Sequence, residues 1–293
     1  MSNISFDLSG KIEPAYLDVI SNVKRVADSL GIPFFLVGAT ARDYLLDHCY
    51  SIKTTRMTSD IDLGVEVANW HQFEELSEAL FATGKFSATG EKQRFLFEGI
   101  LVDIVPFGPV AGSNKKISWP PEHEIFMSML GFEEAYNYSI TVRLSTSPEL
   151  DIEIPTLPGL ALMKLISWKD RYPERPKDAE DLLFIMHNYC DAGNTDRLYD
   201  EEPSLLEDEG FDNQLAGIRL LGKDMAKIAD STTTEAIKAI LNDETGDQSR
   251  NRLVIDMVRA VGFRNRFDEI LRQVEKLKKG FYENPEDLLR NGL

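Results

Sequence analysis

Two kinds of hydrophobic pattern divide the chain. Up to about residue 157, some segments repeat apolar residues every three or four positions, as a helix does. Others are short apolar runs or alternate with polar residues, as strands do. In chain order, the pattern predicts a helix over 11–30, a strand over 34–37, a helix over 40–49, a strand over 59–67, a helix over 70–82, strands over 93–97 and 100–105, and a strand over 151–154. Glu98-Gly99 predicts a tight hairpin turn between two of these strands.

After residue 157 the pattern is helical. Apolar residues recur along one face around Leu182 and again around Val274. The acidic stretch 200–212, which contains a proline and a glycine, is predicted to be a surface loop between helices. The sequence therefore predicts an α+β fold, with a mixed sheet flanked by helices in residues 1–157 and a helical domain in residues 158–293.

The charge of the chain disfavours a protein that grips DNA by its phosphates. With 49 acidic and 32 basic residues among 293, the net charge is −17, and such a field repels a polyanion. Residues 250–279 are the exception, because nine basic residues face only four acidic ones there. This stretch is either a solvated amphipathic helix or a basic rim for an RNA or a nucleotide tail.

The sequence indicates neither a membrane protein nor a secreted one. It has no run of about 18 apolar residues, the length that a membrane-spanning helix needs, and residues 1–10 lack the basic and apolar parts of a secretory signal. Two cysteines, Cys49 and Cys190, are too few for a disulfide framework or a zinc finger. We therefore expect a cytoplasmic protein with no membrane partner.

Asp60 and Asp62 are the first candidates for chemistry. They lie two residues apart in a predicted strand, so we expect their side chains on one face, while Ile61 and Leu63 face the core. Two carboxylates on one face repel each other, and a divalent cation removes that conflict. Hard oxygen ligands of this kind suit Mg²⁺ or Mn²⁺, with bound phosphates completing the shell.

Asp103 strengthens the prediction of a metal site. It interrupts the apolar run 101–105, where an unpaired charge is costly. If that strand lies beside Asp60 and Asp62, the three carboxylates form a cluster that can hold two cations, polarise a phosphate and activate an attacking hydroxyl.

Gly38-Ala39 would supply the phosphate contacts. Small residues at a turn from strand to helix let backbone N–H groups and a helix N-terminus approach a phosphate, and Thr40 would add a hydroxyl donor. A glycine at such a turn is also common for geometric reasons alone.

The order of these motifs resembles the polymerase-β-type nucleotidyltransferase superfamily. Arg56-x-Thr58-x-Asp60-x-Asp62, Lys164 in an apolar helix, and Lys177-Asp178-x-x-Asp181-Leu182 resemble more closely the AbiEii-type toxins of abortive-infection and toxin–antitoxin systems. The likeness spans roughly residues 34–185. The chain departs from the superfamily at Gly38-Ala39, where Gly-Gly or Gly-Ser is usual.

The resemblance implies a nucleotidyltransferase-type fold and a Mg²⁺- or Mn²⁺-dependent, pyrophosphate-releasing transfer from a nucleoside triphosphate to an acceptor hydroxyl. It assigns the metals to Asp60, Asp62 and Asp103, the catalytic site also to Asp178, and the nucleotide to Gly38, Ala39, Thr40 and Lys164. Arg56 would pair with the acidic cluster or touch a phosphate. The helical domain would close the nucleotide cleft, the acceptor would be RNA or protein, and an antitoxin protein is a possible partner.

Lys164 and Asp178 also have structural interpretations. Lys164 interrupts the apolar run 160–166, where it either contacts phosphates or extends to solvent at the edge of a helix. Asp178 and Asp181 are three residues apart and either face the cleft or occupy an exposed first helical turn, where acids suit the helix dipole.

Three other patterns carry less weight. Residues 217–223 have Walker-like spacing, but Asp224 stands where Ser or Thr must bind magnesium, and the context is helical. Asp151-x-Glu153 is a second acidic pair without a glycine turn upstream. The four histidines show no metal-ligand spacing with the cysteines.

The hypothesis that covers most motifs is a toxin-like nucleotidyltransferase. Transfer to a small molecule such as an antibiotic is the alternative enzyme, because an acidic cleft would attract cationic aminoglycosides. A glycosyltransferase would use Asp60 and Asp62 but would leave Asp103 unexplained. The alternative outside catalysis is an inactive nucleotide-binding regulatory module, which Ala39 favours.

Overall fold

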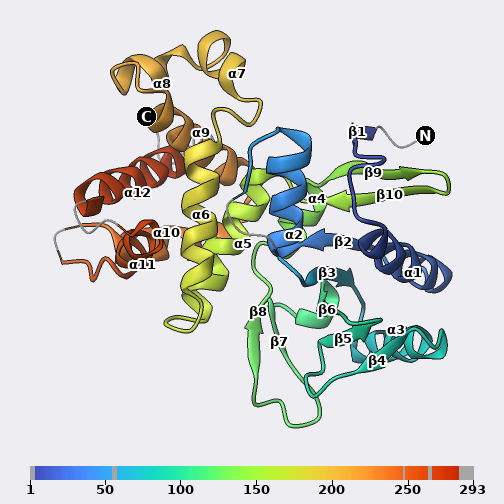
Figure 1. Ribbon diagram of the computed structural model, residues 1–293. Coiled ribbons are helices and arrows are strands. Elements are labelled where there is room, and N and C mark those ends of the chain that lie inside the picture. Colours follow the sequence, from blue (N-terminus) through green and yellow to red (C-terminus); the bar gives the residue numbers. More distant parts are fainter. Residues whose placement is uncertain (1–3, 55–57, 247, 263–265, 284–293) are drawn as a thin grey trace. The chain divides into compact units, whose positions relative to one another are not determined.

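The chain divides into two compact units, Met1–Thr156 and Leu157–Leu293. The structure is a computed structural model that describes residues 4–54, 58–246, 248–262 and 266–283. The first unit, called the sheet unit below, holds the strands, and the second, the helical unit, is built of helices (Figure 1). The fold is thus α+β, as the sequence predicts.

The described part of the sheet unit is built on a mixed sheet of eight strands. The strands are β1 (Ile4–Asp7), β2 (Phe34–Val37), β3 (Ile61–Glu66), β4 (Phe86–Ala88), β5 (Arg94–Phe97), β6 (Ile100–Phe107), β9 (Ile140–Thr146) and β10 (Glu149–Ile154). Their spatial order is β1-β9-β10-β2-β3-β6-β5-β4. Near the centre, β3 runs antiparallel to β2 and parallel to β6. The separate hairpin of β7 (Lys116–Ser118) and β8 (Phe126–Ser128) completes the strands of this region.

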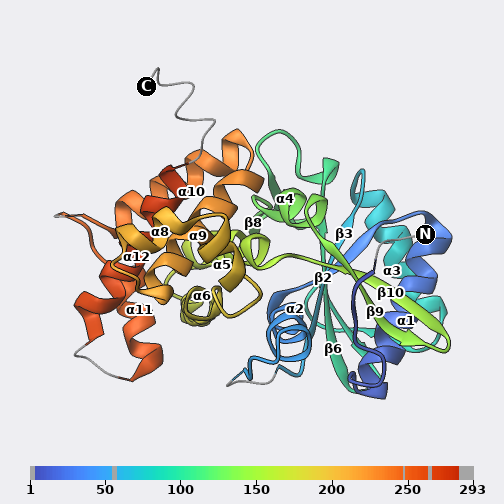
Figure 2. The ribbon, with the colours of Figure 1, turned by 90° about the horizontal axis from the view of Figure 1, so that it is seen from above.

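Helices cover both faces of this sheet. They are α1 (Pro14–Leu30), α2 (Gly38–Asp43), α3 (Trp70–Ala82) and α4 (Phe132–Asn137). On one face, Phe35 packs against Phe107 and against Tyr136 of α4. Helices α1 and α3 lie side by side against the other face (Figure 2). The alternation of β3 explains this, because Leu63 and Val65 are buried on the face opposite to Asp62 and Gly64.

Most elements predicted from the pattern are confirmed, but their ends differ at the candidate site. The helix predicted over 40–49 begins at Gly38 and changes to a π-helical turn over Tyr44–Cys49. The strand predicted over 59–67 is only Ile61–Glu66, so Asp60 lies just before the strand and not within it. The pattern missed β1, β4, the β7–β8 hairpin, β9 and α4, which are short or are completed by pairing with distant segments.

The helical unit is built around the contact of two helices. Its helices are α5 (Leu157–Asp170), α6 (Pro176–Asn188), α7 (Thr195–Asp200), α8 (Pro203–Asp208), α9 (Asn213–Ile228), α10 (Ser231–Glu244), α11 (Arg252–Val261) and α12 (Phe267–Tyr282). Gly222 of α9 and Gly280 of α12 let the two backbones touch. A Cβ added at Gly280 would lie 1.9 Å from the Arg219 carbonyl oxygen, and one at Gly222 would lie 2.2 Å from that of Leu277.

The surface loop predicted over 200–212 is wrong in part, because residues Pro203–Asp208 form α8. Pro203 stands at the start of that helix, where its missing N–H costs nothing, and Leu205 and Leu206 are buried. The proline therefore marks a helix start and not a loop.

Within the part of the chain that the structure describes, no helix is both long and apolar enough to cross a membrane.

Candidate active site

The candidate carboxylates meet at one place in the sheet. Asp62 lies in β3, directly between Val37 of β2 and Asp103 of β6. Residues at paired positions of adjacent strands project to the same face, so Asp62 and Asp103 lie side by side on the face that α4 covers. Asp60 stands two residues before Asp62, at the bend that leads into β3.

Gly38 gives Asp62 its space. It begins α2 with a φ of +68°, and a Cβ at this position would lie 2.0 Å from the Asp62 Oδ2 atom. The conformation and the contact both require glycine, so the backbone at the start of α2 approaches the carboxylate directly. This close approach would allow the backbone N–H groups at the start of α2 and the Asp62 carboxylate to contact the same ligand.

The two residues after Gly38 face inward. Ala39 is buried, and Thr40 is 2% exposed, with its hydroxyl donating a hydrogen bond of 2.8 Å to the main-chain carbonyl of Asp60. Ser59 donates a second bond, of 2.9 Å, to the Asp60 side chain. In this arrangement Thr40 holds the bend that carries Asp60.

Asp103 is bound by an arginine that our sequence interpretation overlooked. Arg94, at the start of β5, donates from Nε and Nη2 to the two oxygens of Asp103, each at 2.8 Å. Asp103 is 9% exposed. The hydrogen bonds that Arg94 donates to Asp103 raise the pKa of Arg94, although burial opposes the rise. The negative charge of Asp60 nearby adds to it. The pair thus satisfies the buried charge that made Asp103 conspicuous.

The hairpin turn contained the signal for Arg94. A two-residue turn at Glu98-Gly99 sets Phe97 opposite Ile100, and counting outward places Arg94 opposite Asp103, as observed.

Carboxylates alone do not assemble a ready metal site here. Among the residues that the structure describes, no group of three or more histidine, cysteine, aspartate or glutamate side chains is arranged to hold a metal ion. The bidentate contact with Arg94 accounts for both oxygens of Asp103. Arg56 lies outside the described residues.

Lys164 and Asp178 meet in the helical unit. Lys164, on α5, forms ion pairs of 2.9 Å with Asp178 and 2.7 Å with Asp181, both on α6. The hydroxyl of Ser167 donates to the second oxygen of Asp178 at 2.8 Å. Burial opposes the charged form of Lys164, but the two carboxylates outweigh it and raise the pKa of its ammonium. Asp178 and Asp181 are buried, so neither occupies an exposed first turn.

Comparison with known proteins identifies the family. The sequence pattern of the family described as "Nucleotidyl transferase AbiEii toxin, Type IV TA system" matches residues 23–275, most of the chain. The chain belongs to this AbiEii family. Its activity class is therefore nucleotidyl transfer within a toxin–antitoxin system, and the resemblance predicted from scattered motifs is confirmed. None of the curated proteins compared with the chain matches it.

Several solved structures are similar to this AbiEii-family protein at low sequence identity. The crystal structure of an antigenic nucleotidyltransferase-like protein from Paracoccidioides brasiliensis is 18% identical, with a TM-score of 0.39 over 61% of this chain and 77% of the other. A complex of ANT(2")-Ia with adenylyl-2"-tobramycin is 16% identical, with a TM-score of 0.35 over 69% and 96%. A CCA-adding enzyme with ATP is 13% identical, with a TM-score of 0.33 over 96% and 82%.

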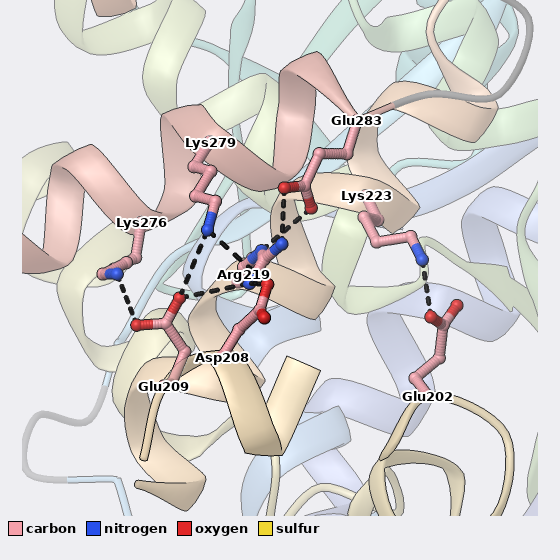
Figure 3. Close-up of polar contacts among 8 residues, drawn as sticks. All are labelled: Glu202, Asp208, Glu209, Arg219, Lys223, Lys276, Lys279 and Glu283. Carbon is pink, nitrogen blue, oxygen red and sulfur yellow. Dashed lines mark hydrogen bonds and ion pairs between the residues drawn. The ribbon is translucent and has the colours of Figure 1, made fainter. Parts of the chain in front are cut away.

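The Walker-like spacing of the AbiEii-family chain is explained by packing. Gly222 makes room for α12, and Lys223 forms an ion pair of 2.6 Å with Glu202. Figure 3 shows Lys223 among the ion pairs of this region. Asp151 is likewise engaged, by a bidentate contact with Arg143 at 2.8 and 2.9 Å, and Glu153 accepts from Ser139 and Thr141.

Several basic residues of the stretch 250–279 pair with acidic residues of other helices and their caps. Lys276 and Lys279 pair with Glu209, which also pairs with the buried Arg219 of α9 (Figure 3). Arg252 pairs with Glu244. These contacts favour a structural role for Arg252, Lys276 and Lys279; Arg264 lies outside the described residues.

Proposed function

We propose that this AbiEii-family protein moves a nucleoside monophosphate from a nucleoside triphosphate to the hydroxyl of an RNA or protein acceptor, with release of pyrophosphate. The register that sets Asp62 beside Asp103, with the Gly38 backbone against Asp62, carries the proposal. We further propose that the protein acts as a toxin with an antitoxin partner. Both cysteines are without a disulfide, which suits the reducing cytoplasm.

The donor chemistry at Asp60 and Asp62 fits Mg²⁺ or Mn²⁺, because both present carboxylate oxygens. These two residues would hold the cation. Asp103 joins them as a ligand only if its contact with Arg94 opens. When bound, the cation would polarise the α-phosphate and lower the pKa of the acceptor hydroxyl.

The remaining residues would orient the reactants. The backbone N–H groups at Gly38 and Ala39 would face the phosphates, and Thr40 would act through the bend that it fixes at Asp60. Asp103 would help to activate the acceptor hydroxyl, as a metal ligand or a proton acceptor, once its contact with Arg94 opens. Arg56 would contact phosphate or carboxylate.

In the helical unit, Lys164 would neutralise charge on the triphosphate, with Asp178 near the catalytic site. An ammonium has three N–H donors, and Asp178 and Asp181 take two of them.

A small-molecule acceptor is the second candidate. The net charge of −17 would attract a cationic aminoglycoside. An inactive nucleotide-binding module would retain affinity for triphosphates without turnover, and Ala39 is the feature that supports it.

A transfer assay tests the proposal. The full chain is incubated with each α-labelled nucleoside triphosphate, Mg²⁺ or Mn²⁺, and in turn total RNA, cell extract or an aminoglycoside panel. Label is expected in RNA or protein, and chelation of the metal should abolish it. Asp60→Ala with Asp62→Ala should also abolish it, whereas Asp151→Asn, a change at a carboxylate elsewhere in the same sheet, should leave it within about threefold.

Label that appears only in aminoglycosides would show that the acceptor is a small molecule and not RNA or protein. Wild-type turnover in the Asp60/Asp62 double variant would overturn the metal assignment. Tight triphosphate binding by calorimetry without transfer to any acceptor would favour the inactive module.

A further inference from the structure

A pocket of about 580 Å³ opens in the sheet unit, lined by residues of α3, of the β4–β5 segment and of the loop between β7 and β8. Trp70, Glu74, Ser77 and Phe81 line it from α3, at spacings of four, three and four residues. This spacing forms one stripe along the helix, while Leu76 and Leu80 are buried. The helix therefore turns a second, partly aromatic face toward an open cavity of the size that ligands occupy.

The walls of the pocket are aromatic rings on fixed supports. Trp70 contacts Trp119 with ring centroids 5.2 Å apart, and Phe81 contacts Phe95 at 5.4 Å. Trp119 and Phe95 are 5% and 2% exposed, so they back the wall, whereas Phe81 is 37% exposed and presents its ring to the cavity side. Supported rings of this kind bind flat aromatic groups by stacking with little loss of conformational entropy.

The charges at the rim select among flat ligands. Glu74, Glu91, Lys92 and Arg94 line the pocket. The guanidinium of Arg94 is bound to Asp103 and Glu91, so the charges that remain at the rim, Glu74 and Lys92, are opposite in sign and give no net charge to attract a polycation. Lys92 is close to half exposed and pairs only at the surface, with Glu122 at 2.9 Å. An exposed surface pair is weak and is readily exchanged for a phosphate. An uncharged ring with a phosphate beside it matches this rim.

Arg94 connects the pocket to the candidate active site. It lines the pocket and also binds both oxygens of Asp103. Side chains alternate along β5, so Arg94 turns to the face of Asp103 while Phe95 turns to α3. The pocket and Asp103 thus lie on the two faces of the sheet near one edge, so a ring in the pocket would belong to a different nucleotide from the one that carries the reacting hydroxyl.

We propose that this pocket binds an unpaired nucleobase of a single-stranded nucleic-acid acceptor, stacked on Trp70 and Phe81, with a backbone phosphate near Lys92. The inference rests on the proposed function, because it assumes that the acceptor hydroxyl reacts beside Asp103. It commits that acceptor to nucleic acid, since an aminoglycoside has no flat ring to stack and adds positive charge beside Lys92. Stacking accepts every base, so the pocket would recognise an unpaired base and not a sequence.

The three tryptophans of the chain allow a direct test, because two line the pocket and the third, Trp168, lies in the helical unit. The probe is a single-stranded adenosine pentanucleotide, and its control is the same pentamer without bases. The protein is the full chain with Asp60→Ala and Asp62→Ala, labelled with ¹⁵N at the indole nitrogens, which are assigned by tryptophan-to-phenylalanine variants. Nuclear magnetic resonance titrations follow the three signals.

We expect the Trp70 and Trp119 signals to move and the Trp168 signal to stay. The dissociation constant should rise at least about fivefold for the base-free pentamer and for Phe81→Ala. Phe126→Ala, which removes an exposed ring outside the pocket, should change it less than twofold. Ser77→Trp, which fills the pocket from α3, should weaken binding as Phe81→Ala does. It replaces Phe81→Ala in the test if the Phe81→Ala protein does not fold.

Unchanged affinity in folded Phe81→Ala or Ser77→Trp would overturn the proposal, as would equal binding of the base-free pentamer. Displacement of the pentamer by a saturating non-hydrolysable triphosphate with Mg²⁺, tested in the chain that retains Asp60 and Asp62, would assign the pocket to the donor base instead. A Gly-Tyr-Gly peptide that moves the same signals when the pentamer does not would make it a protein-binding surface.

These titrations require no turnover and separate the two hypotheses. Pentamer binding that depends on the pocket, without nucleotidyl transfer in the earlier assay, would contradict only the proposed function. Transfer with no effect of the pocket variants on pentamer binding would remove only this inference.

Discussion

At the residue scale, the candidate site depends on positions where a side chain acts through its neighbour. Thr40 fixes the carbonyl of Asp60, and Arg94 fixes both oxygens of Asp103. Neither residue belongs to the acidic motif, yet each determines where a carboxylate of that motif stands. Such supporting contacts usually decide whether a catalytic group is held closely enough to work.

Gly38→Ala should displace the Asp62 carboxylate while the protein still folds. The added Cβ would meet Asp62 Oδ2 at 2.0 Å, and the φ of +68° disfavours alanine. We expect transfer to fall by about 100-fold or more because Asp62 is displaced, while the free energy of unfolding falls by only about 1–2 kcal/mol. Gly31→Ala is the control, since its φ of +64° disfavours alanine in the same way but nothing lies within 4 Å of its added Cβ. A Gly38→Ala protein with normal turnover would remove Asp62 from the mechanism.

At the scale of elements, α5 and α6 are joined by the buried cluster of Lys164, Asp178 and Asp181. The cluster carries one positive and two negative charges in a region of low exposure, and Ser167 adds a hydrogen bond to it. Breaking such a cluster on one side leaves buried charge without compensation, which is costly. The two helices are therefore held by charge as well as by apolar packing.

Lys164→Met should reduce the free energy of unfolding by about 3–5 kcal/mol at pH 7. The pKa of Lys164 is raised above 10.5, so its contribution is present throughout neutral pH and is lost as pH rises through that raised pKa. The gap between wild type and variant, measured by denaturant unfolding, should accordingly be constant from pH 7 to 9 and narrow above 10.5. A triple variant that also carries Asp178→Asn and Asp181→Asn should recover part of the loss.

The same variant tests the role of Lys164 in nucleotide binding. We expect triphosphate affinity, measured in the folded variant by calorimetry, to fall as well. A large loss of stability with unchanged affinity would restrict Lys164 to the structural role.

At the scale of the whole molecule, each compact unit has its own packed interior. The sheet unit is organised by β2, β3 and β6, and the helical unit by the contact of α9 with α12 at Gly222 and Gly280. The ion pairs around Arg219 join α8, α9 and α12 beside that contact (Figure 3). A defect in one interior should therefore remain largely within its unit.

Gly280→Ala should show this separation. The new Cβ would lie 1.9 Å from a backbone oxygen of α9, so the helices must move apart, at a cost of about 3 kcal/mol. Hydrogen exchange followed by mass spectrometry should speed up across residues 157–283 and stay unchanged across residues 4–156. Arg272→Ala, at an exposed position of the same helix, should leave the exchange rates of both units unchanged. Equal acceleration in both units would show that they unfold together.

The sequence by itself determined the family, the fold class and the motif residues. Periodicity identified α1, α3, β2 and β6, because an amphipathic helix and a buried strand each have a local signature. The order of Gly38, the Asp60-x-Asp62 pair and Asp103 carried the resemblance that the family match confirms. Even the partner of Asp103 was within reach, since a two-residue turn fixes the register that brings Arg94 opposite it.

Only the tertiary structure decided which of these residues meet and what each one contacts. No local pattern sets β3 between β2 and β6, gives Thr40 the carbonyl of Asp60, or gives Lys164 two aspartates from α6, because these contacts join segments that are distant in sequence. The same holds for residues 200–212, whose acidic composition indicates a loop but whose carboxylates pair with Arg219 and Lys276 once α9 and α12 lie beside them. Pairing across a fold determines the environment of a charge, and composition determines only its presence.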